Sequence, residues 1–197
     1  AGITITYLTS YHALVQRANI QPGETLLVLG AAGGVGSTAV ELGKALGATV
    51  IAAASSDDKL ALCTELGADH VINYSNESLK DRVKELTGGA GVDVVYDPVG
   101  GDFSEPAVRS MGWNGRYLVI GFASGPIPSI PLNLTLLKGC SIVGVFWGRF
   151  TMEEPEVHLA NIETLWQWFE EGKIKPVITD LFPIEEYEGA YAAMMER

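Results

Sequence analysis

Residues 29–36 read LGAAGGVG, and this stretch decides the fold. It begins at the end of the uncharged apolar run Thr25–Gly30. It precedes Ser37–Leu46, where apolar residues recur at the helical period. An apolar run without alternation is typical of a strand that is buried on both faces. A glycine-rich turn between such a strand and a helix indicates a dinucleotide-binding unit, because small residues let the backbone approach a pyrophosphate.

The glycine pattern departs from the strict motif Gly-x-Gly-x-x-Gly. Ala31 stands at the first glycine position, whereas Gly33 and Gly36 keep theirs. No Lys-Ser or Lys-Thr pair follows at the spacing of a P-loop. A tight turn without a ligand is the alternative, but four glycines in seven residues exceed what a turn needs. We therefore predict that a pyrophosphate binds at the helix N-terminus, against the backbone of Gly30, Ala31, Ala32, Gly33, Gly34, Val35 and Gly36.

The remaining chain repeats the pattern of a short apolar run followed by a helical segment. Five further strands are expected at residues 49–54, 71–74, 92–96, 116–120 and 141–146. Helices are expected at residues 6–18, 56–66, 75–86, 103–111, 132–138, 154–171 and 184–196, and an extended piece at 176–182. This alternation predicts an α/β Rossmann fold, a six-stranded parallel sheet of order 3-2-1-4-5-6 with helices on both faces.

Length and charge bound the classes of function. The 197 residues are typical of one domain, and a net charge of −11 opposes binding to nucleic acid or to an anionic membrane surface. The longest uncharged run, residues 117–137, contains three prolines and cannot be one membrane helix. Two cysteines are too few for a disulfide framework, and residues 1–10 lack the basic start of a secretory signal. We therefore expect a cytoplasmic protein with free thiols.

Several segments together resemble the quinone oxidoreductase (zeta-crystallin-like) branch of the medium-chain dehydrogenase/reductase superfamily. They are GAAGGVG (30–36), ALGATVIAAASS (45–56), ELGADHVINY (65–74), GVDVVYDPVGG (91–101) and GRYLVIGFASG (115–125), with TYLTSYHAL (6–14) before them. The resemblance implies that residues 1–197 are an NADP(H)-binding domain. It also implies that residues 1–20 and 172–197 join a catalytic domain, which lies upstream in full-length members.

The activity that the resemblance implies is hydride transfer from NADPH to a quinone or an activated alkene. An enoyl-thioester or alkenal reductase of the same superfamily is one alternative. A non-catalytic NADPH-binding protein is the other. No catalytic acid can be assigned from these residues, because the proton donor can belong to the catalytic domain.

The end of the second strand favours NADPH over NADH. NAD-dependent proteins place a carboxylate there, which binds the ribose hydroxyls, whereas this strand ends in Ser55 and Ser56. The resemblance implies that Ser55, Ser56, Lys59 and Tyr74 surround the 2′-phosphate of NADPH, and a place on the solvated face of a helix is the alternative for Lys59. The acidic residues at 57–58 oppose this prediction, because their negative charges would repel a phosphate. The alternative is that they stabilise the next helix as acids of its first turn.

Further cofactor contacts are expected where the fourth, fifth and sixth strands end. Asp97 follows the fourth strand and can contact a ribose, with a turn-forming role as the alternative. The resemblance implies that residues after the fifth and sixth strands line the nicotinamide. These residues are Gly121, Phe122, Ala123, Phe146 and Trp147. A place in the hydrophobic core is the alternative for the aromatic residues among them.

The sequence predicts that the protein has no metal site and that it forms a homodimer. His12, His70 and His158 are scattered without ligand spacing, and Ile3–Ile5 stand where zinc-dependent relatives have a cysteine ligand. The strand at 141–146 ends the expected sheet without a charge or a proline, so its outer edge can pair with a second copy. The resemblance implies such a homodimer, and cover by residues 176–182 is the alternative.

Overall fold

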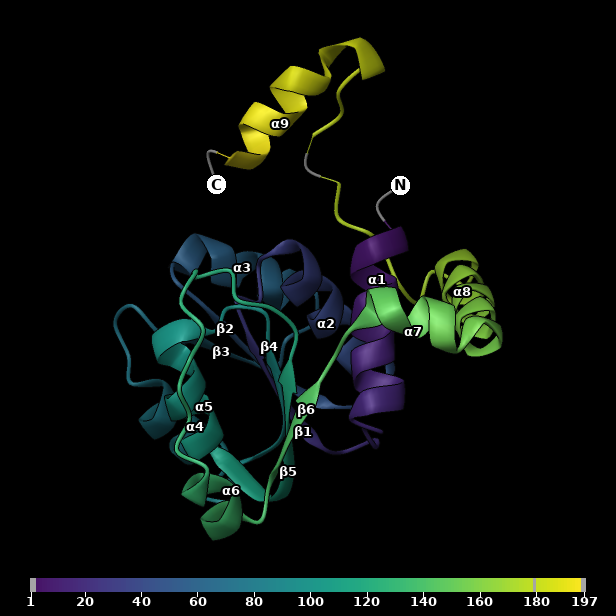
Figure 1. Cartoon of the computed structure of the whole chain (residues 1–197). Helices are drawn as coiled ribbons and strands as arrows, with labels where there is room; N and C mark the ends of the chain where they lie inside the picture. Colours follow the sequence, from purple (N-terminus) through teal and green to yellow (C-terminus); the bar gives the residue numbers. More distant parts are fainter. Residues whose placement is uncertain (1–2, 179, 196–197) are drawn as a thin grey trace.

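A computed structural model describes residues 3–178 and 180–195, so residues 1, 2, 179, 196 and 197 of the terminal segments lie outside the description. The strands form one parallel sheet of order β3-β2-β1-β4-β5-β6, as predicted (Figure 1). Their bounds are Thr25–Leu29 (β1), Thr49–Ala54 (β2), His70–Asn73 (β3), Val92–Asp97 (β4), Met111–Val119 (β5) and Ser141–Gly144 (β6).

Helices cover both faces of the sheet (Figure 1). The core on one face includes residues of α1 (Thr4–Tyr11), the π-helix η1 (His12–Arg17), α2 (Gly34–Ala45), α3 (Asp57–Glu65) and α8 (Pro155–Glu170). The core on the other face includes residues of α4 (Leu79–Leu86), α5 (Ser104–Arg109) and α6 (Asn133–Lys138). The remaining helical elements are η2 (Gly101–Phe103), α7 (Trp147–Glu153), η3 (Ile184–Glu186) and α9 (Tyr187–Met195).

Some boundaries differ from the predicted ones for local reasons. Ser78 accepts a hydrogen bond from the Asp81 amide, so α4 begins at Leu79 and not at residue 75. Met111 begins β5 instead of ending a helix, since it pairs with Val92. Strand β6 ends at Gly144 and not at residue 146, and the chain then turns into α7, a helix that the sequence pattern did not predict.

The C-terminal segment is helical only at its end. The described residues of 176–182 form no strand, so the extended piece expected there does not join the sheet. Figure 1 shows α9 lying apart from the helices that flank the sheet. Within the part of the chain that the structure describes, no helix is both long and apolar enough to span a membrane.

A buried hydroxyl holds the first helix against the sheet. Ser10 of α1 lies 2.8 Å from the Thr38 hydroxyl and 2.8 Å from the Tyr96 hydroxyl, and it also donates to the Val35 carbonyl. These partners belong to α2 and β4. The bonds therefore place α1 beside the first turn of α2, and buried polar groups of this kind are stable because each has partners.

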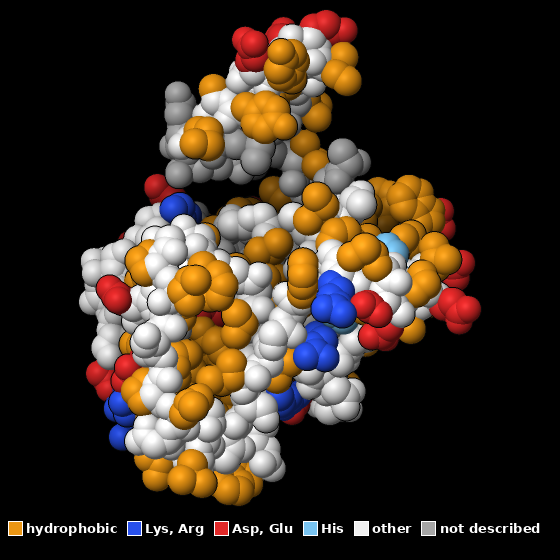
Figure 2. Space-filling model, in the orientation of Figure 1, with side chains coloured by type: hydrophobic (Ala, Val, Ile, Leu, Met, Phe, Trp, Pro, Cys, Tyr) orange, Lys and Arg blue, Asp and Glu red, His pale blue; other side chains and the backbone are white. Residues whose placement is uncertain are grey.

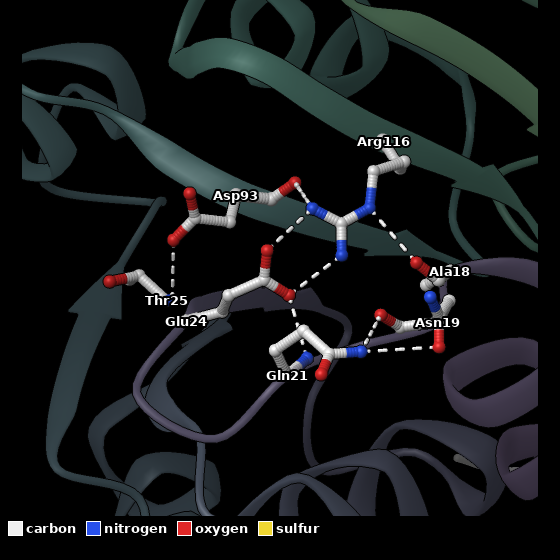
Figure 3. A network of polar contacts seen from close by, with 7 residues as sticks. All are labelled: Ala18, Asn19, Gln21, Glu24, Thr25, Asp93 and Arg116. Carbon is white, nitrogen blue, oxygen red and sulfur yellow. Dashed lines mark hydrogen bonds and ion pairs between the residues drawn. The ribbon is translucent and has the colours of Figure 1, made fainter.

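A charged network closes the amino-terminal edge of the sheet (Figure 3). Arg116 of β5 donates through both terminal nitrogens to the Glu24 carboxylate, at 2.8 and 2.7 Å, and its Nε donates to the Ala18 carbonyl at 3.0 Å. Beside it, Asp93 accepts from the Thr25 amide at 2.8 Å. The hydrogen bond from Arg116 lowers the pKa of Glu24 below its ordinary value. The loop before β1 is therefore tied to β4 and β5.

We expect Glu24→Gln to lower the free energy of unfolding at pH 7 by about 1–2 kcal/mol, because Arg116 loses a charged partner in a half-buried position. Since folding lowers the Glu24 pKa, the contribution is complete above the ordinary value of about 4.3 and disappears as the pH falls through the folded-state pKa. Denaturant titrations at several pH values should therefore show that the difference in the free energy of unfolding between the wild type and Glu24→Gln becomes smaller in acid.

The matched control for this experiment is Glu153→Gln. Glu153 pairs with Arg149 on α7, and both side chains are more than 60% exposed. Its substitution should change stability by less than about 0.5 kcal/mol. Equal effects of the two substitutions would contradict a special role for the network at Arg116.

Candidate functional site

The glycine loop connects the carboxyl end of β1 with the N-terminus of α2. Gly30 adopts a left-handed conformation, with φ of +56°, and its carbonyl accepts from the Gly33 amide at 2.9 Å. Gly33 is the N-cap of α2 and has no side chain to cap the helix. The first amides of α2, at Gly34, Val35 and Gly36, have no partner within the helix. Free amides and the positive end of the helix dipole form a site for an anion.

The glycines of this loop differ in what a side chain would meet. A Cβ added to Gly36 would lie 2.2 Å from the Gly30 carbonyl oxygen, and one added to Gly30 would lie 2.7 Å from Val99 Cγ2. These two glycines are required by packing. Gly33 and Gly34 are exposed, so they leave the surface above the free amides open. The shape of the loop thus fits a pyrophosphate that lies on the backbone.

The alanine in the glycine motif has a structural explanation. Ala31 is fully buried in the core that α1 and α2 share, and its amide donates to the Ala53 carbonyl at 3.0 Å. A methyl group at this position therefore points away from the open surface. Alanine in place of the first glycine of the motif therefore leaves that surface unchanged. The next residue, Ala32, is half-buried against the same core.

The residues expected at the 2′-phosphate gather at the carboxyl ends of β2 and β3. Lys59 Nζ donates to the Ser55 hydroxyl at 3.3 Å, and Ser56 caps α3 by accepting from the Lys59 amide at 3.5 Å. The Tyr74 hydroxyl also hydrogen-bonds with Ser55, although burial raises its pKa above the ordinary value. An ammonium group and three hydroxyls therefore lie close together at this edge, and this donor set suits a dianionic phosphate.

The two acids beside this cluster lie in the first turn of α3. Asp57 accepts a hydrogen bond from the Asn73 side-chain amide at 2.7 Å, so its carboxylate is held toward β3. Asp57 and Asp58 also lie at the positive end of the α3 dipole. Both observations agree with the helix-stabilising explanation of the two acids.

Asp97 is buried beneath the turn that follows β4. Its Oδ1 accepts from the amides of Val99 and Gly100 at 2.7 and 2.8 Å. Its Oδ2 accepts from the hydroxyls of Ser104, at 3.0 Å, and Tyr117. All of these bonds are internal and the residue is 1% exposed, so the carboxylate orders the turn. This geometry is the one expected for the turn-forming alternative, and a contact of Asp97 with a ribose stays a prediction.

The turn at Asp97 is bonded to the segment that follows β5. Amides of Ile120 and Gly121 donate to the Asp97 carbonyl, and the Ala123 amide donates to the Pro98 carbonyl at 3.0 Å. Phe122 is exposed and borders a cavity of about 260 Å³ with Gly121 and Ile142. Figure 2 shows hydrophobic side chains gathered on this face beside β6. An apolar cavity at the strand ends suits a planar ring.

The two aromatic residues after β6 have different surroundings. Phe146 is 73% exposed, so its ring is available for contact. Trp147 packs against the core, and its ring meets the His158 ring edge-on at 5.7 Å between centroids. The structure therefore brings Phe146 to the surface at the carboxyl end of the sheet, whereas Trp147 is half-buried and contacts His158 of α8.

Sequence reasoning missed the residues that brace these turns. Val99 lies against Gly30, and Ser104 and Tyr117, which are 7 and 20 residues away in the sequence, hold Asp97. Pro176 and Val177 border a cavity with Gly34 of α2. No spacing within the sequence indicates these contacts, because they depend on how strands and helices pack.

The described residues contain no group of three or more His, Cys, Asp or Glu side chains that could hold a metal ion. Zinc independence stays a prediction.

Comparisons with known proteins agree with this architecture. The profile of the zinc-binding dehydrogenase family matches residues 34–164. Quinone oxidoreductase-like protein 2 of Bos taurus is 42% identical over 198 aligned positions, which cover 100% of this chain and 57% of that protein.

Solved structures of related enzymes share the fold. The crystal structure of 2-haloacrylate reductase superposes with a TM-score of 0.92 at 30% identity, covering 100% of this chain and 62% of that one. The enoyl reductase CurK superposes with a TM-score of 0.87 at 28% identity, covering 100% and 58%.

The chain therefore belongs to the zinc-binding dehydrogenase family and, within the medium-chain dehydrogenase/reductase superfamily, to the quinone oxidoreductase branch. It spans a little more than half the length of the curated relatives that it matches. Its sequence and fold correspond to their cofactor-binding domain.

We expect Gly36→Ala to lower the free energy of unfolding by at least about 2 kcal/mol, because the added Cβ would collide with the backbone of Gly30 and Ala31. Gly33→Ala is the matched control. Its backbone conformation suits any residue, with φ of −75°, and its Cβ would lie 3.2 Å from one carbonyl oxygen, so the loss should stay below about 1 kcal/mol. Thermal and urea unfolding measure the stabilities of the two variants. Equal stabilities would contradict the inference that packing requires a glycine at position 36.

Proposed function

We propose that this chain is the NADPH-binding domain of a zinc-independent oxidoreductase, which transfers hydride from NADPH to a quinone or an activated alkene. One observation carries the proposal: the free helix amides at Gly34, Val35 and Gly36 lie at the same sheet edge as the cluster of Ser55, Lys59 and Tyr74. A dinucleotide with a 2′-phosphate needs both sites, one for its pyrophosphate and one for its third phosphate.

Each part of the proposed site has a separate task. The amides of the glycine loop would bind the pyrophosphate, and Lys59 with the hydroxyls of Ser55, Ser56 and Tyr74 would neutralise the 2′-phosphate. The backbone of Gly121 and Ala123 and the exposed rings of Phe122 and Phe146 would shape the apolar surface at the nicotinamide. Bound there, the nicotinamide supplies the hydride, while the chain orients it and excludes water.

The substrate pocket is proposed to lie between this domain and a catalytic domain formed by the rest of the protein. The terminal segments 1–20 and 172–197 would join the two domains. Hydrophobic side chains on α9 support this proposal, because Tyr191 and Met195 are 67% and 86% exposed. The relatives named as a haloacrylate reductase and an enoyl reductase support an activated alkene as the second candidate substrate.

The test is steady-state turnover by the full-length protein with benzoquinone as acceptor. We expect NADPH to have a KM at least about tenfold lower than NADH, a difference of about 1.4 kcal/mol in binding. Lys59→Ala should raise the KM for NADPH about tenfold and leave the KM for NADH unchanged, because only NADPH carries the 2′-phosphate. Gly33→Val should weaken binding of both cofactors by blocking the amides.

The outcomes separate the candidates. Turnover of an enoyl thioester with no turnover of quinones would favour the alkene reductase, and cofactor binding without turnover of either would favour the non-catalytic alternative. Equal KM values for the two cofactors would overturn the assignment of NADPH.

The protein is also proposed to act as a homodimer through β6. Within the described residues β6 pairs only with β5, and the described residues of 176–182 do not cover its outer edge. Ser141 and Ile142 are exposed there. At the end of β6 the Gly144 carbonyl accepts a hydrogen bond from Arg17 Nε at 3.0 Å. The rest of this unpaired edge favours pairing with a second copy across a two-fold axis.

Light scattering at micromolar concentration should therefore find a dimer. Ile142→Lys should shift it toward monomer, because each dimer would receive two charges beside the contact. Val157→Lys on α8 is the control, since Val157 has the same exposed fraction of 38% and lies away from β6. A monomeric wild-type protein would reject the proposal.

A further inference from the structure

A basic cavity lies at the amino-terminal edge of the sheet, away from the glycine loop. It has a volume of about 280 Å³ and is formed where α4, α5 and α6 end, beside the loop that leads into β4. Its lining is Lys80, Lys84, Gly89, Ala90, Gly91, Arg109, Ser110, Met111 and Lys138. Four of these nine residues are cationic and none is acidic.

This composition is unusual for the chain as a whole. The protein has 13 Lys and Arg residues against 24 Asp and Glu residues. A random surface of nine residues would therefore carry more acids than bases. The cavity reverses the sign of the protein's charge at one place, and its walls concentrate the positive potential.

Helix ends and internal bonds explain part of this cluster. Lys84, Arg109 and Lys138 lie in the last turns of α4, α5 and α6, where the helix dipole favours cations. Arg109 is also paired with Glu105, and Lys138 Nζ donates to the Met111 carbonyl at 3.0 Å. These two side chains are held in place, and each keeps further N–H groups for another partner.

Neither explanation covers Lys80. It is the second residue of α4, so its charge lies near the positive end of the helix dipole. Lys84 lies four residues further on the same face of the helix, and like charges at this spacing repel each other. Within the described chain, neither ammonium group has a hydrogen-bond or ion-pair partner. This arrangement destabilises the free helix and becomes favourable when an anion lies between the charges.

We propose that this cavity binds a small multivalent anion of the phosphate or diphosphate class. Lys80 and Lys84 would bind it directly, while Arg109 and Lys138 would contribute their remaining donors. The amides of Gly89, Ala90 and Gly91 already donate to residues 84–87, so the contacts would come from side chains and not from a backbone cradle. The cavity is separate from the proposed dinucleotide site, and the proposal does not depend on that site.

The test is a titration of the full chain with inorganic pyrophosphate, followed by amide NMR. We expect the amide signals of Gly89, Gly91 and Ser110 to shift, with a Kd below about 1 mM. Pyrophosphate that binds at the glycine loop would instead shift Gly33, Gly34 and Gly36. The residue-specific signals therefore separate the two sites.

Substitutions that remove one charge identify the residues responsible. Lys80→Gln and Lys84→Gln should each weaken binding at the cavity about fivefold, and both are exposed, so the fold should be retained. Lys175→Gln is the matched control, because Lys175 is exposed, carries the same charge and lies outside the cavity. Lys175→Gln should change the Kd for pyrophosphate at the cavity by less than about twofold.

Two results would overturn the proposal. One is the absence of shifts at Gly89, Gly91 and Ser110 at millimolar pyrophosphate. The other is an equal loss of affinity in all three variants, because this would show that general charge, and not the cavity, attracts the anion.

Discussion

The close contact between Gly36 and the Gly30 carbonyl is the constraint on which the candidate site depends. The first turn of α2 can approach the end of β1 this closely only because Gly36 has no side chain. That approach aims the helix amides at the open edge of the sheet, and it leaves Gly33 and Gly34 exposed above them. A small change in this packing would alter the direction of the helix dipole together with the positions of its free donors.

The neighbouring turns brace this contact from the other side. Val99 packs against Gly30, and the turn that carries Val99 is organised by the buried carboxylate of Asp97. Asp97 is in turn held by Ser104 and Tyr117, and burial together with the Asp97 charge raises the pKa of Tyr117. The phenol therefore stays protonated and donates its hydrogen bond. A network with complete hydrogen bonding in a dry interior is rigid, so the strand ends keep one geometry.

Charge is distributed unevenly along the strand direction of this acidic protein. At the carboxyl edge, Lys59 lies among hydroxyl groups beside a helix N-terminus. At the amino-terminal edge, Arg116 is neutralised by Glu24, whereas Lys80 and Lys84 have no anionic partner in the described chain. The pair of Arg116 and Glu24 stabilises the fold, whereas Lys59, Lys80 and Lys84 leave positive charge available for an anion from solution.

The sequence by itself determined the order of the strands, the glycine loop and the neutral end of β2, because these follow from local patterns of apolar, small and polar residues. Local patterns could not reveal that Asp97 is saturated by Ser104 and Tyr117, that Trp147 packs on α8, or that Lys80 and Lys138 share one cavity. Those facts depend on contacts between residues far apart in the chain. Only the tertiary structure decides them, since side-chain direction and burial are set when the helices pack on the sheet.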